Sequence, residues 1–368
     1  MRRLLVTGGA GFIGANFVHY WLEKHPGDRI VVLDALTYAG NRASLEAAEG
    51  RDEFRFVHGS IGDTPLVEQL LREERLDTIV NFAAESHVDR SIAGPDAFIE
   101  TNIVGTHSLL KAARRVWMQE KLVPHHRFHH VSTDEVYGSL GPDDPPFTEN
   151  TPYAPNSPYS ASKASSDHLV RAYHHTYGLD VTTSNCSNNY GSYQFPEKLI
   201  PLVIINALQG KPLPIYGDGL NVRDWLFVDD HCRAIDAIIE RGQSGDCYNV
   251  GGDCARTNRK VVATICAAID QAFATDSTLG VRYPDCPAAH STSCISLETF
   301  VADRPGHDRR YAIDARKLAA NIGVIPLEGF DSGIGKTLRW YLSAKTWWQQ
   351  ILSRTCEKPC RRNDAVQR

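Results

Sequence analysis

Tyr159 and Lys163 form the first pair of residues whose types and spacing predict chemistry. They stand four positions apart, so on a helix they lie one above the other, and Pro158 just before them is a typical first helical residue. An ammonium near a phenol lowers the cost of forming the phenolate. The pair can therefore take a proton from a sugar hydroxyl near neutral pH, although the same spacing also occurs in ordinary surface pairs.

Thr133, Asp134 and Glu135 form a second group of this kind. They follow the apolar run 128–131, at the carboxyl end of an expected strand, where open α/β sheets bind their ligands. Two neighbouring carboxyls in different environments can hold opposite protonation states and so supply one acid and one base at neutral pH. Thr133 is expected to share a sugar hydroxyl with Tyr159. The alternative is that the two acids are ordinary solvated charge on a loop.

Three glycines, Gly8, Gly11 and Gly14, lie between a strand-like run and a helical pattern. Such a turn can bring backbone N–H groups against a pyrophosphate at the positive end of a helix. Asp34 lies 20 residues after Gly14 and ends the second apolar run. A carboxylate there can accept from both ribose hydroxyls and would repel a 2′-phosphate. The pattern predicts NAD rather than NADP, with Asp63 as a candidate contact to the adenine edge.

These residues need a rigid frame, which the apolar runs predict. Strands are expected at 4–6, 30–33, 54–57, 78–82, 128–131 and 181–184, with helical periodicity in most of the intervals. The alternation predicts an α/β fold with a Rossmann-like, doubly wound parallel sheet and a smaller mixed substrate-binding lobe. The NAD-binding domain is expected at 1–185 with a return segment at 226–250, the lobe at 186–225 and 251–345, and a basic, disordered tail at 353–368.

The bulk composition excludes several classes of protein. The 368 residues are 42% hydrophobic, enough for a large core, and a net charge of −5 with dispersed Lys and Arg does not fit nucleic-acid binding. No apolar run is long enough to span a membrane, and the strand-like run that follows Met1, Arg2 and Arg3 leaves no room for a signal peptide. The nine cysteines are odd in number and contain no C-x-x-C pair, which is typical of reduced thiols in a cytoplasmic protein.

Six motifs, in order along the chain, resemble those of a known family. They are GGAGFIG at 8–14, AAESHVDRS at 83–91, TDEVYG at 133–138, YSASK at 159–163, SNNYG at 187–191 and RPGHD at 304–308. With them the chain resembles the dTDP-glucose 4,6-dehydratases of the extended short-chain dehydrogenase/reductase superfamily, nearly continuously from Leu4 to about Leu352. The resemblance implies an NAD-dependent enzyme whose substrate is the sugar nucleotide dTDP-glucose.

The resemblance also implies a closed redox cycle. Tyr159 would remove the C4 hydroxyl proton as hydride leaves C4 for NAD⁺, and Glu135 would then abstract the acidified C5 proton. Asp134, held protonated, would protonate the departing C6 hydroxyl. Return of the hydride to C6, with reprotonation of C5, would give dTDP-4-keto-6-deoxyglucose. Elimination requires this second acid and base, which the similar 4-epimerases lack.

Further residues are assigned by the resemblance alone. Cofactor contacts are expected from Gly8, Gly11, Phe12, Ile13, Gly14, Asp34, Ala35, Leu36, Thr37, Ser60, Ile61, Ala83, Ala84, Ser86, Thr101, Tyr159, Lys163 and Asn189. Substrate contacts are expected from Ser86, His87, Thr133, Asn188, Glu197, Lys198, Leu199, Pro214, Ile215, Tyr216, Arg223, Asn258, Arg304 and His307. The resemblance further implies a homodimer that pairs through the helices at 99–113 and 164–177.

Some positions depart from the family pattern. Ser60 stands where an acidic residue is usual, Ser192 replaces a proline, and the segment 274–296 is longer than expected. Because these positions bear on the nucleotide rather than the chemistry, a UDP-glucose 4,6-dehydratase stays open as an alternative. A sugar-nucleotide 4-epimerase or a noncatalytic NAD-binding scaffold would not need all four of Asp134, Glu135, Tyr159 and Lys163.

No metal site is predicted. The paired histidines at 125–126 and 129–130 flank a strand without a carboxylate or cysteine at ligand spacing, and Cys356 and Cys360 have no further ligands nearby in the sequence. The chemistry described above needs no metal ion.

Overall fold

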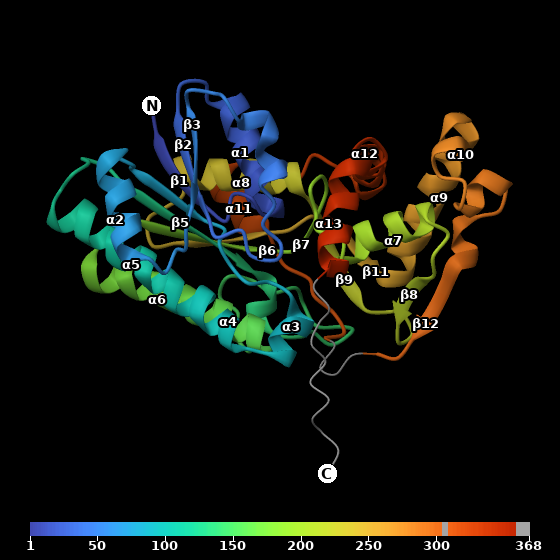
Figure 1. The fold of residues 1–368 in the computed structure, drawn as a ribbon. Helices are drawn as coiled ribbons and strands as arrows, with labels where there is room; N and C mark the ends of the chain where they lie inside the picture. The colour runs from blue at the N-terminus through green and yellow to red at the C-terminus, as the bar shows by residue number, and fades with distance from the viewer. Residues whose placement is uncertain (304–307, 358–368) are drawn as a thin grey trace, which may run out of the picture.

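A seven-stranded parallel sheet forms the centre of the computed structural model, which describes residues 1–303 and 308–357 (Figure 1). Its strand order is β10-β6-β5-β4-β1-β2-β3. The strands are β1 (Arg3–Thr7), β2 (Arg29–Asp34), β3 (Phe54–His58), β4 (Thr78–Asn81), β5 (Arg127–Thr133), β6 (Val181–Cys186) and β10 (Cys247–Val250). Both faces of such a sheet are covered, which explains why runs like that of β2 are apolar without alternation. The predicted fold class is confirmed.

Helices cover both faces of this sheet (Figure 1). One layer contains α2 (Thr64–Glu73), η2 (Ile99–Gly105), α5 (Thr106–Ala113), η3 (Arg114–Gln119) and α6 (Pro158–Tyr177), and the other contains α1 (Phe12–Lys24), α8 (Val228–Arg241) and α11 (Arg316–Ile322). Successive residues of β1 serve the two layers in turn, since Leu5 belongs to the first core and Leu4 and Val6 to the second. The sheet therefore holds its strand ends rigidly between two apolar cores.

The smaller lobe is built around two short sheets. One has the order β11-β9-β7 and the other pairs β12 with β8. Its strands are β7 (Asn188–Tyr190), β8 (Leu213–Tyr216), β9 (Val222–Phe227), β11 (Ala255–Thr257) and β12 (Glu298–Val301), and its helices are α7 (Leu199–Leu208), α9 (Asn258–Thr275), α10 (Thr278–Arg282), α12 (Phe330–Ser343) and α13 (Lys345–Glu357). Short elements complete the chain: η1 (Arg42–Ala48), α3 (Val88–Ala93), α4 (Asp96–Phe98), η4 (Asp134–Tyr137), η5 (Pro287–His290) and η6 (Cys294–Leu297). No helix of the described residues is long and apolar enough to cross a membrane.

The structure departs from the expected boundaries at two places near the C-terminus. Helix α11 falls inside the segment expected to form the lobe, yet Leu318 and Ile322 pack with Tyr248 and Val250 of β10 on the first domain. Residues 353–357, expected to begin a disordered tail, continue helix α13, because Trp348 and Ile351 bury one face of that helix. Composition alone does not reveal this packing. The rest of the expected tail, 358–368, lies outside the described residues.

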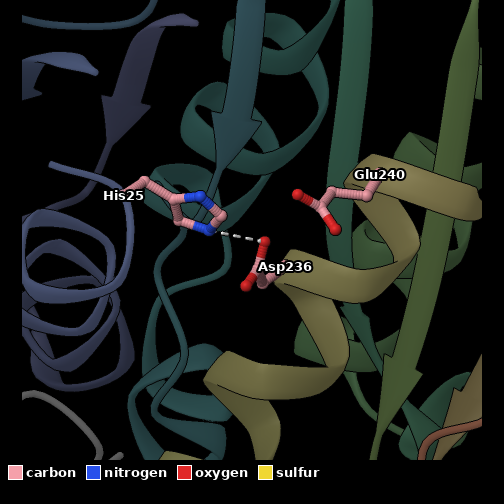
Figure 2. A group of neighbouring side chains, drawn as sticks. All are labelled: His25, Asp236 and Glu240. Carbon is pink, nitrogen blue, oxygen red and sulfur yellow. Dashed lines mark hydrogen bonds and ion pairs between the residues drawn. The ribbon is translucent and has the colours of Figure 1, made fainter. Parts of the chain in front are cut away.

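A polar cluster joins the first helix to α8 on the side of the sheet away from the lobe. His25 Nε2 lies 3.0 Å from Asp236 Oδ1, and Glu240 stands one helical turn further along α8 (Figure 2). The other Asp236 oxygen accepts a hydrogen bond from the Tyr20 hydroxyl at 2.9 Å. The ligand atoms of the three residues lie within 4.8 Å of one another, but both Asp236 oxygens already have proton donors. The arrangement is explained as a hydrogen-bonded link between two helices.

Candidate active site

A cavity of about 390 Å³ lies at the carboxyl ends of the parallel strands. Its wall contains the glycine loop after β1 and the segments after β2, β4 and β5, together with residues 186–189, 194, 195 and 198. This is where open α/β sheets bind ligands, because the strand ends and the helix N-termini face the same space. The predicted cofactor loop and the predicted catalytic residues therefore share one cavity.

The glycine loop lies close to the backbone of the segment that follows β4. Gly8 has a φ of +66°, and a Cβ on it would lie 2.7 Å from the backbone nitrogen of Ala83. A Cβ on Gly14 would lie 2.4 Å from the Gly8 carbonyl oxygen. Gly11 is the N-cap of α1 and offers no side chain to the first backbone N–H groups of the helix. The loop fits a pyrophosphate, because it leaves both space and donors at a helix N-terminus.

Asp34 is held by the backbone of its own and the neighbouring loop. Its Oδ2 accepts from the Ala10 backbone N–H at 2.9 Å and its Oδ1 from that of Leu36 at 2.7 Å. Burial raises the pKa of this carboxyl, while the two backbone N–H groups lower it. The carboxylate is thus fixed at the end of β2 and lines the cavity, as a ribose acceptor would need to be.

Asp134 and Glu135 lie in the short helix η4, which begins after β5. The Thr133 side chain caps this helix by accepting from the Glu135 N–H at 3.3 Å. Asp134 is 2% exposed, and its Oδ2 has no hydrogen-bond partner within the described structure. Burial, then the nearby Glu135 and Asp224 carboxylates, raise the pKa of Asp134 well above its usual value. Burial therefore favours the protonated form of Asp134 beside a more exposed glutamate, and such an arrangement can supply one acid and one base.

Tyr159 stands in the first turn of α6. Ser157 caps this helix by a reciprocal pair of bonds with Ser160, and Pro158 begins it, so the position of Tyr159 is set locally. Burial, followed by the Glu135 carboxylate, raises the pKa of the phenol well above its usual value, while a hydrogen bond with Thr133 lowers it. Thr133 and Tyr159 thus lie together, ready to share one hydroxyl.

Lys163 lies beneath Tyr159 but does not bond to it. Its Nζ donates to the Val131 carbonyl at 2.8 Å, and only 4% of the residue is exposed. The sequence predicts that the Lys163 ammonium lowers the cost of forming the Tyr159 phenolate. In the structure the two side chains share no hydrogen bond, because Lys163 donates to a carbonyl near the end of β5. Burial lowers the pKa of Lys163 and the Asp167 carboxylate raises it.

The lobe side of the cavity carries amides and one lysine. Asn188 Oδ1 is buried and has no hydrogen-bond partner among the described residues. Asn189 is oriented by His231, whose Nδ1 lies 2.9 Å from Asn189 Oδ1. Lys198 Nζ donates to the Ser86 carbonyl at 3.3 Å. An orphaned acceptor that faces a cavity is a reason to expect a ligand donor there.

The structure brings most of the predicted site residues together. The cavity is lined by all five catalytic candidates, by every cofactor candidate except Leu36, and by Ser86, Asn188 and Lys198 of the substrate candidates. Candidates that do not line it are Leu36, His87, Glu197, Leu199, Pro214, Ile215, Tyr216, Arg223 and Asn258. Arg304 and His307 lie outside the described residues. Leu36 instead contributes the N–H that holds Asp34.

Several substrate candidates have partners within the protein itself. Glu197 lies 3.3 Å from Arg90 and 3.5 Å from His87. Arg223 is 6% exposed, stacks 4.3 Å from the Tyr311 ring and donates to the Asp308 carbonyl. Ile215 is 2% exposed, whereas its neighbour Tyr216 is 42% exposed. An isoleucine side chain buried in this way offers no surface to a base, because β8 turns it inward.

Sequence reasoning missed part of the cavity wall. The missed residues with polar or aromatic side chains include Tyr38, Glu85, Ser132, Cys186, Ser187, Gln194 and Phe195. Glu85 lies within a motif that the sequence already marks, so its neighbours could have indicated it. Tyr38 and Phe195 lie on loops 157 positions apart in the sequence, and their ring centroids are 5.6 Å apart. Only the fold brings them together.

Known proteins resemble the chain over nearly its whole length. The family model described as GDP-mannose 4,6 dehydratase matches residues 5–337. A dTDP-glucose 4,6-dehydratase from Xanthomonas campestris pv. campestris is 57% identical over 357 residues, covering 96% of each chain. The solved dTDP-glucose 4,6-dehydratase from Bacillus anthracis, in complex with NAD, has a TM-score of 0.82 and 44% identity and covers 95% of this chain and 100% of its own. That from Streptomyces venezuelae, with NAD and TYD bound, has a TM-score of 0.83 and 46% identity, with coverages of 95% and 99%.

Proposed function

The chain belongs to the GDP-mannose 4,6 dehydratase family, and from this premise we propose that it is an NAD-dependent dTDP-glucose 4,6-dehydratase. The observation that carries the proposal is the buried Asp134, whose pKa is raised by burial, beside Glu135 in the same cavity as Tyr159 and the glycine loop. An enzyme that only oxidises a carbinol has no use for this second acid and base. The dehydratase relatives that bind NAD support the cofactor.

NAD is assigned to the glycine loop and the end of β2. The pyrophosphate would lie at the N-terminus of α1, and Asp34 would accept from the adenosine ribose hydroxyls. The nicotinamide half would extend toward Tyr159, Lys163 and Asn189. When bound, NAD supplies the hydride acceptor for C4 and the hydride that C6 finally receives.

The residues of the chain then handle the protons. Tyr159, next to Thr133, takes the C4 hydroxyl proton when it is in its phenolate form, and together with loss of the C4 hydride this leaves a ketone at C4, which acidifies C5–H. Glu135 removes the C5 proton, and Asp134 delivers its proton to the C6 hydroxyl, which leaves as water. Burial favours the protonated form of Asp134 for this step, and C5 is reprotonated when C6 receives the hydride.

The dTDP group is assigned to the lobe side of the cavity. Asn188 offers an orphaned amide oxygen and Lys198 a cation near the mouth. Outside the residues that line the cavity, Tyr216 is the exposed aromatic of β8 that remains available to a base, and Asn258 begins α9 in the lobe. The further contacts with Arg304 and His307 that the sequence resemblance implies stay predictions.

A direct assay tests the assigned activity. The purified protein is incubated with dTDP-glucose and, separately, with UDP-glucose, and the alkali-induced absorbance of a 4-keto-6-deoxy product is followed. We expect product from dTDP-glucose without consumption of added NAD, and a lower kcat/KM with UDP-glucose. A higher kcat/KM with UDP-glucose would assign the nucleotide differently, and a 4-epimerised sugar without dehydration would contradict the proposal.

The proposal extends to a homodimer in the cytoplasm. Ile99 and Val104 of η2 and Tyr177 of α6 are 49%, 41% and 41% exposed, on the two helices that the resemblance assigns to pairing. Apolar side chains exposed along neighbouring helices are a suitable face for a two-fold contact. The seven described cysteines are unpaired, in keeping with a reducing compartment.

A further inference from the structure

A buried polar cluster lies behind Lys163, on the side away from the cavity. Asp167, one helical turn after Lys163 on α6, is 5% exposed. Its Oδ2 accepts from the Ser132 hydroxyl at 2.8 Å and from the Tyr153 hydroxyl at 3.0 Å. Its Oδ1 lies 3.3 Å from Nε2 of His130, and that same nitrogen lies 3.5 Å from Lys163 Nζ. The imidazole therefore stands between a buried carboxylate and a buried ammonium.

The hydrogen bonds around His130 determine where its proton lies. The Asn81 amide donates to His130 Nδ1 at 3.1 Å, and the amide orientation is set by Thr7, whose hydroxyl donates to Asn81 Oδ1 at 2.6 Å. Nδ1 is thus an acceptor, so a neutral His130 carries its proton on Nε2, which lies 3.3 Å from Asp167 Oδ1. Nε2 cannot then accept from Lys163. Lys163 Nζ donates instead to the Val131 carbonyl, and Lys163 also lines the cavity.

A buried ammonium is strongly destabilised unless an opposite charge lies near it. We propose that Asp167 is a positioning residue that supplies the buried counter-charge for Lys163, with neutral His130 as the spacer that holds Nζ against the end of β5. The proposal rests on the assigned dehydratase function, in which Lys163 serves turnover. Asp167 itself touches neither the substrate nor the cofactor.

The electrostatics of the surrounding groups agree with this assignment. Asp167 is the first charge that raises the pKa of Lys163 against the effect of burial. Burial, together with the Lys163 charge, lowers the pKa of His130 to about 4, so the spacer is neutral at working pH.

The thiols and phenols that lie around the pair have pKa values raised by burial, which favours their uncharged forms. Cys186 on β6 faces Lys163, and burial raises the pKa of its thiol to about 12. Tyr159 on α6, and Tyr137, Tyr153 and Cys247 around Asp167, all have raised pKa values with burial as the largest cause. Asp167 is therefore the charge that a substitution can remove selectively.

The test compares Asp167→Asn with a matched variant, Asp236→Asn. Asp236 is also buried, at 6% exposed, accepts from a tyrosine and lies beside a histidine, but it belongs to the link between α1 and α8 (Figure 2). The pKa of the Lys163 ammonium is measured by NMR of isotope-labelled lysine side chains, with Lys163→Arg used only to assign the signal. The pH profile of kcat is recorded for the same proteins.

We expect Asp167→Asn to lower the Lys163 pKa by about one unit or more and to move the alkaline limb of the kcat profile the same way, while Asp236→Asn changes neither. Asp167→Glu, which keeps the charge, should restore most of the shift. An unchanged Lys163 pKa in Asp167→Asn would overturn the proposal, even if activity fell. If that variant does not fold, a Lys163 pKa below about 7 in the parent protein would overturn it instead. The NMR readout needs no turnover, so it separates this inference from the dehydratase assignment.

Discussion

At the scale of single residues, the decisive contrast is between two neighbouring carboxyls. Asp134 is buried against Glu135 and Asp224, and its pKa is raised well above the usual value, whereas Glu135 is partly exposed. A carboxyl with a raised pKa stays protonated below that pKa and loses its proton as the pH rises through it. The acid step should therefore fail on the alkaline side of the pH profile, because Asp134 can no longer donate.

Glu135→Gln tests the base assigned at this scale. The amide keeps the size of the side chain but cannot accept the C5 proton, so we expect formation of the 4-keto-6-deoxy product to fall by roughly 100-fold or more. Oxidation at C4 should persist, visible as transient NADH absorbance in a single-turnover experiment. NAD binding, measured by calorimetry, is the control and should not change. Product formation at the parent's rate would remove Glu135 from its role.

At the scale of elements, the glycine loop and helix α1 act as one unit. The loop connects β1 to α1. Gly8 has a positive φ and lies close to the backbone of Ala83, which follows β4. The sequence predicts this unit because glycine spacing, the preceding apolar run and the later Asp34 are all local patterns. It does not predict that Leu36 serves Asp34 through its backbone rather than facing the cavity.

Gly8→Ala tests whether the loop holds the cofactor. The added Cβ would meet the Ala83 nitrogen at 2.7 Å in a conformation that costs about 1–2 kcal/mol for an L-residue, so we expect the NAD dissociation constant to rise by roughly tenfold or more. Gly50→Ala is the matched control, since Gly50 has a φ of +82° with nothing within 4 Å of a Cβ. It should cost stability alone. Equal NAD binding by both variants and the parent would contradict the assignment.

At the scale of the whole molecule, the cavity exists because the first domain and the smaller lobe meet at the carboxyl ends of the parallel strands. After β6 the chain forms β7, and residues 186–189, 194, 195 and 198 contribute to the cavity wall together with the glycine loop. Further along the chain, β10 pairs with β6. The same scale includes the exposed apolar positions on η2 and α6, which lie on the helix layer of the first domain and do not line the cavity.

Val104→Glu tests the proposed dimer face. A charge buried at a two-fold contact meets its own copy, so light scattering should report a shift toward the monomer at assay concentrations. Val104 is 41% exposed in the single chain, so the monomer fold should tolerate the change. Val281→Glu, at an 84% exposed position on α10, is the control and should leave the mass unchanged. A parent protein that is itself a monomer would remove the prediction.

The sequence by itself determined the candidate site residues and the frame that carries them. Glycine spacing, Asp34, the four-residue step from Tyr159 to Lys163 and the acid pair after an apolar run are local patterns, and local patterns can be read from a chain. Only the tertiary structure decided the state of each group. The Asp224 carboxylate, 90 positions away, raises the pKa of Asp134, and Lys163 on α6 lies 3.5 Å from His130 and donates to the Val131 carbonyl, both on β5. Desolvation and Coulomb interactions act through space, so the protonation states of this site follow from the fold.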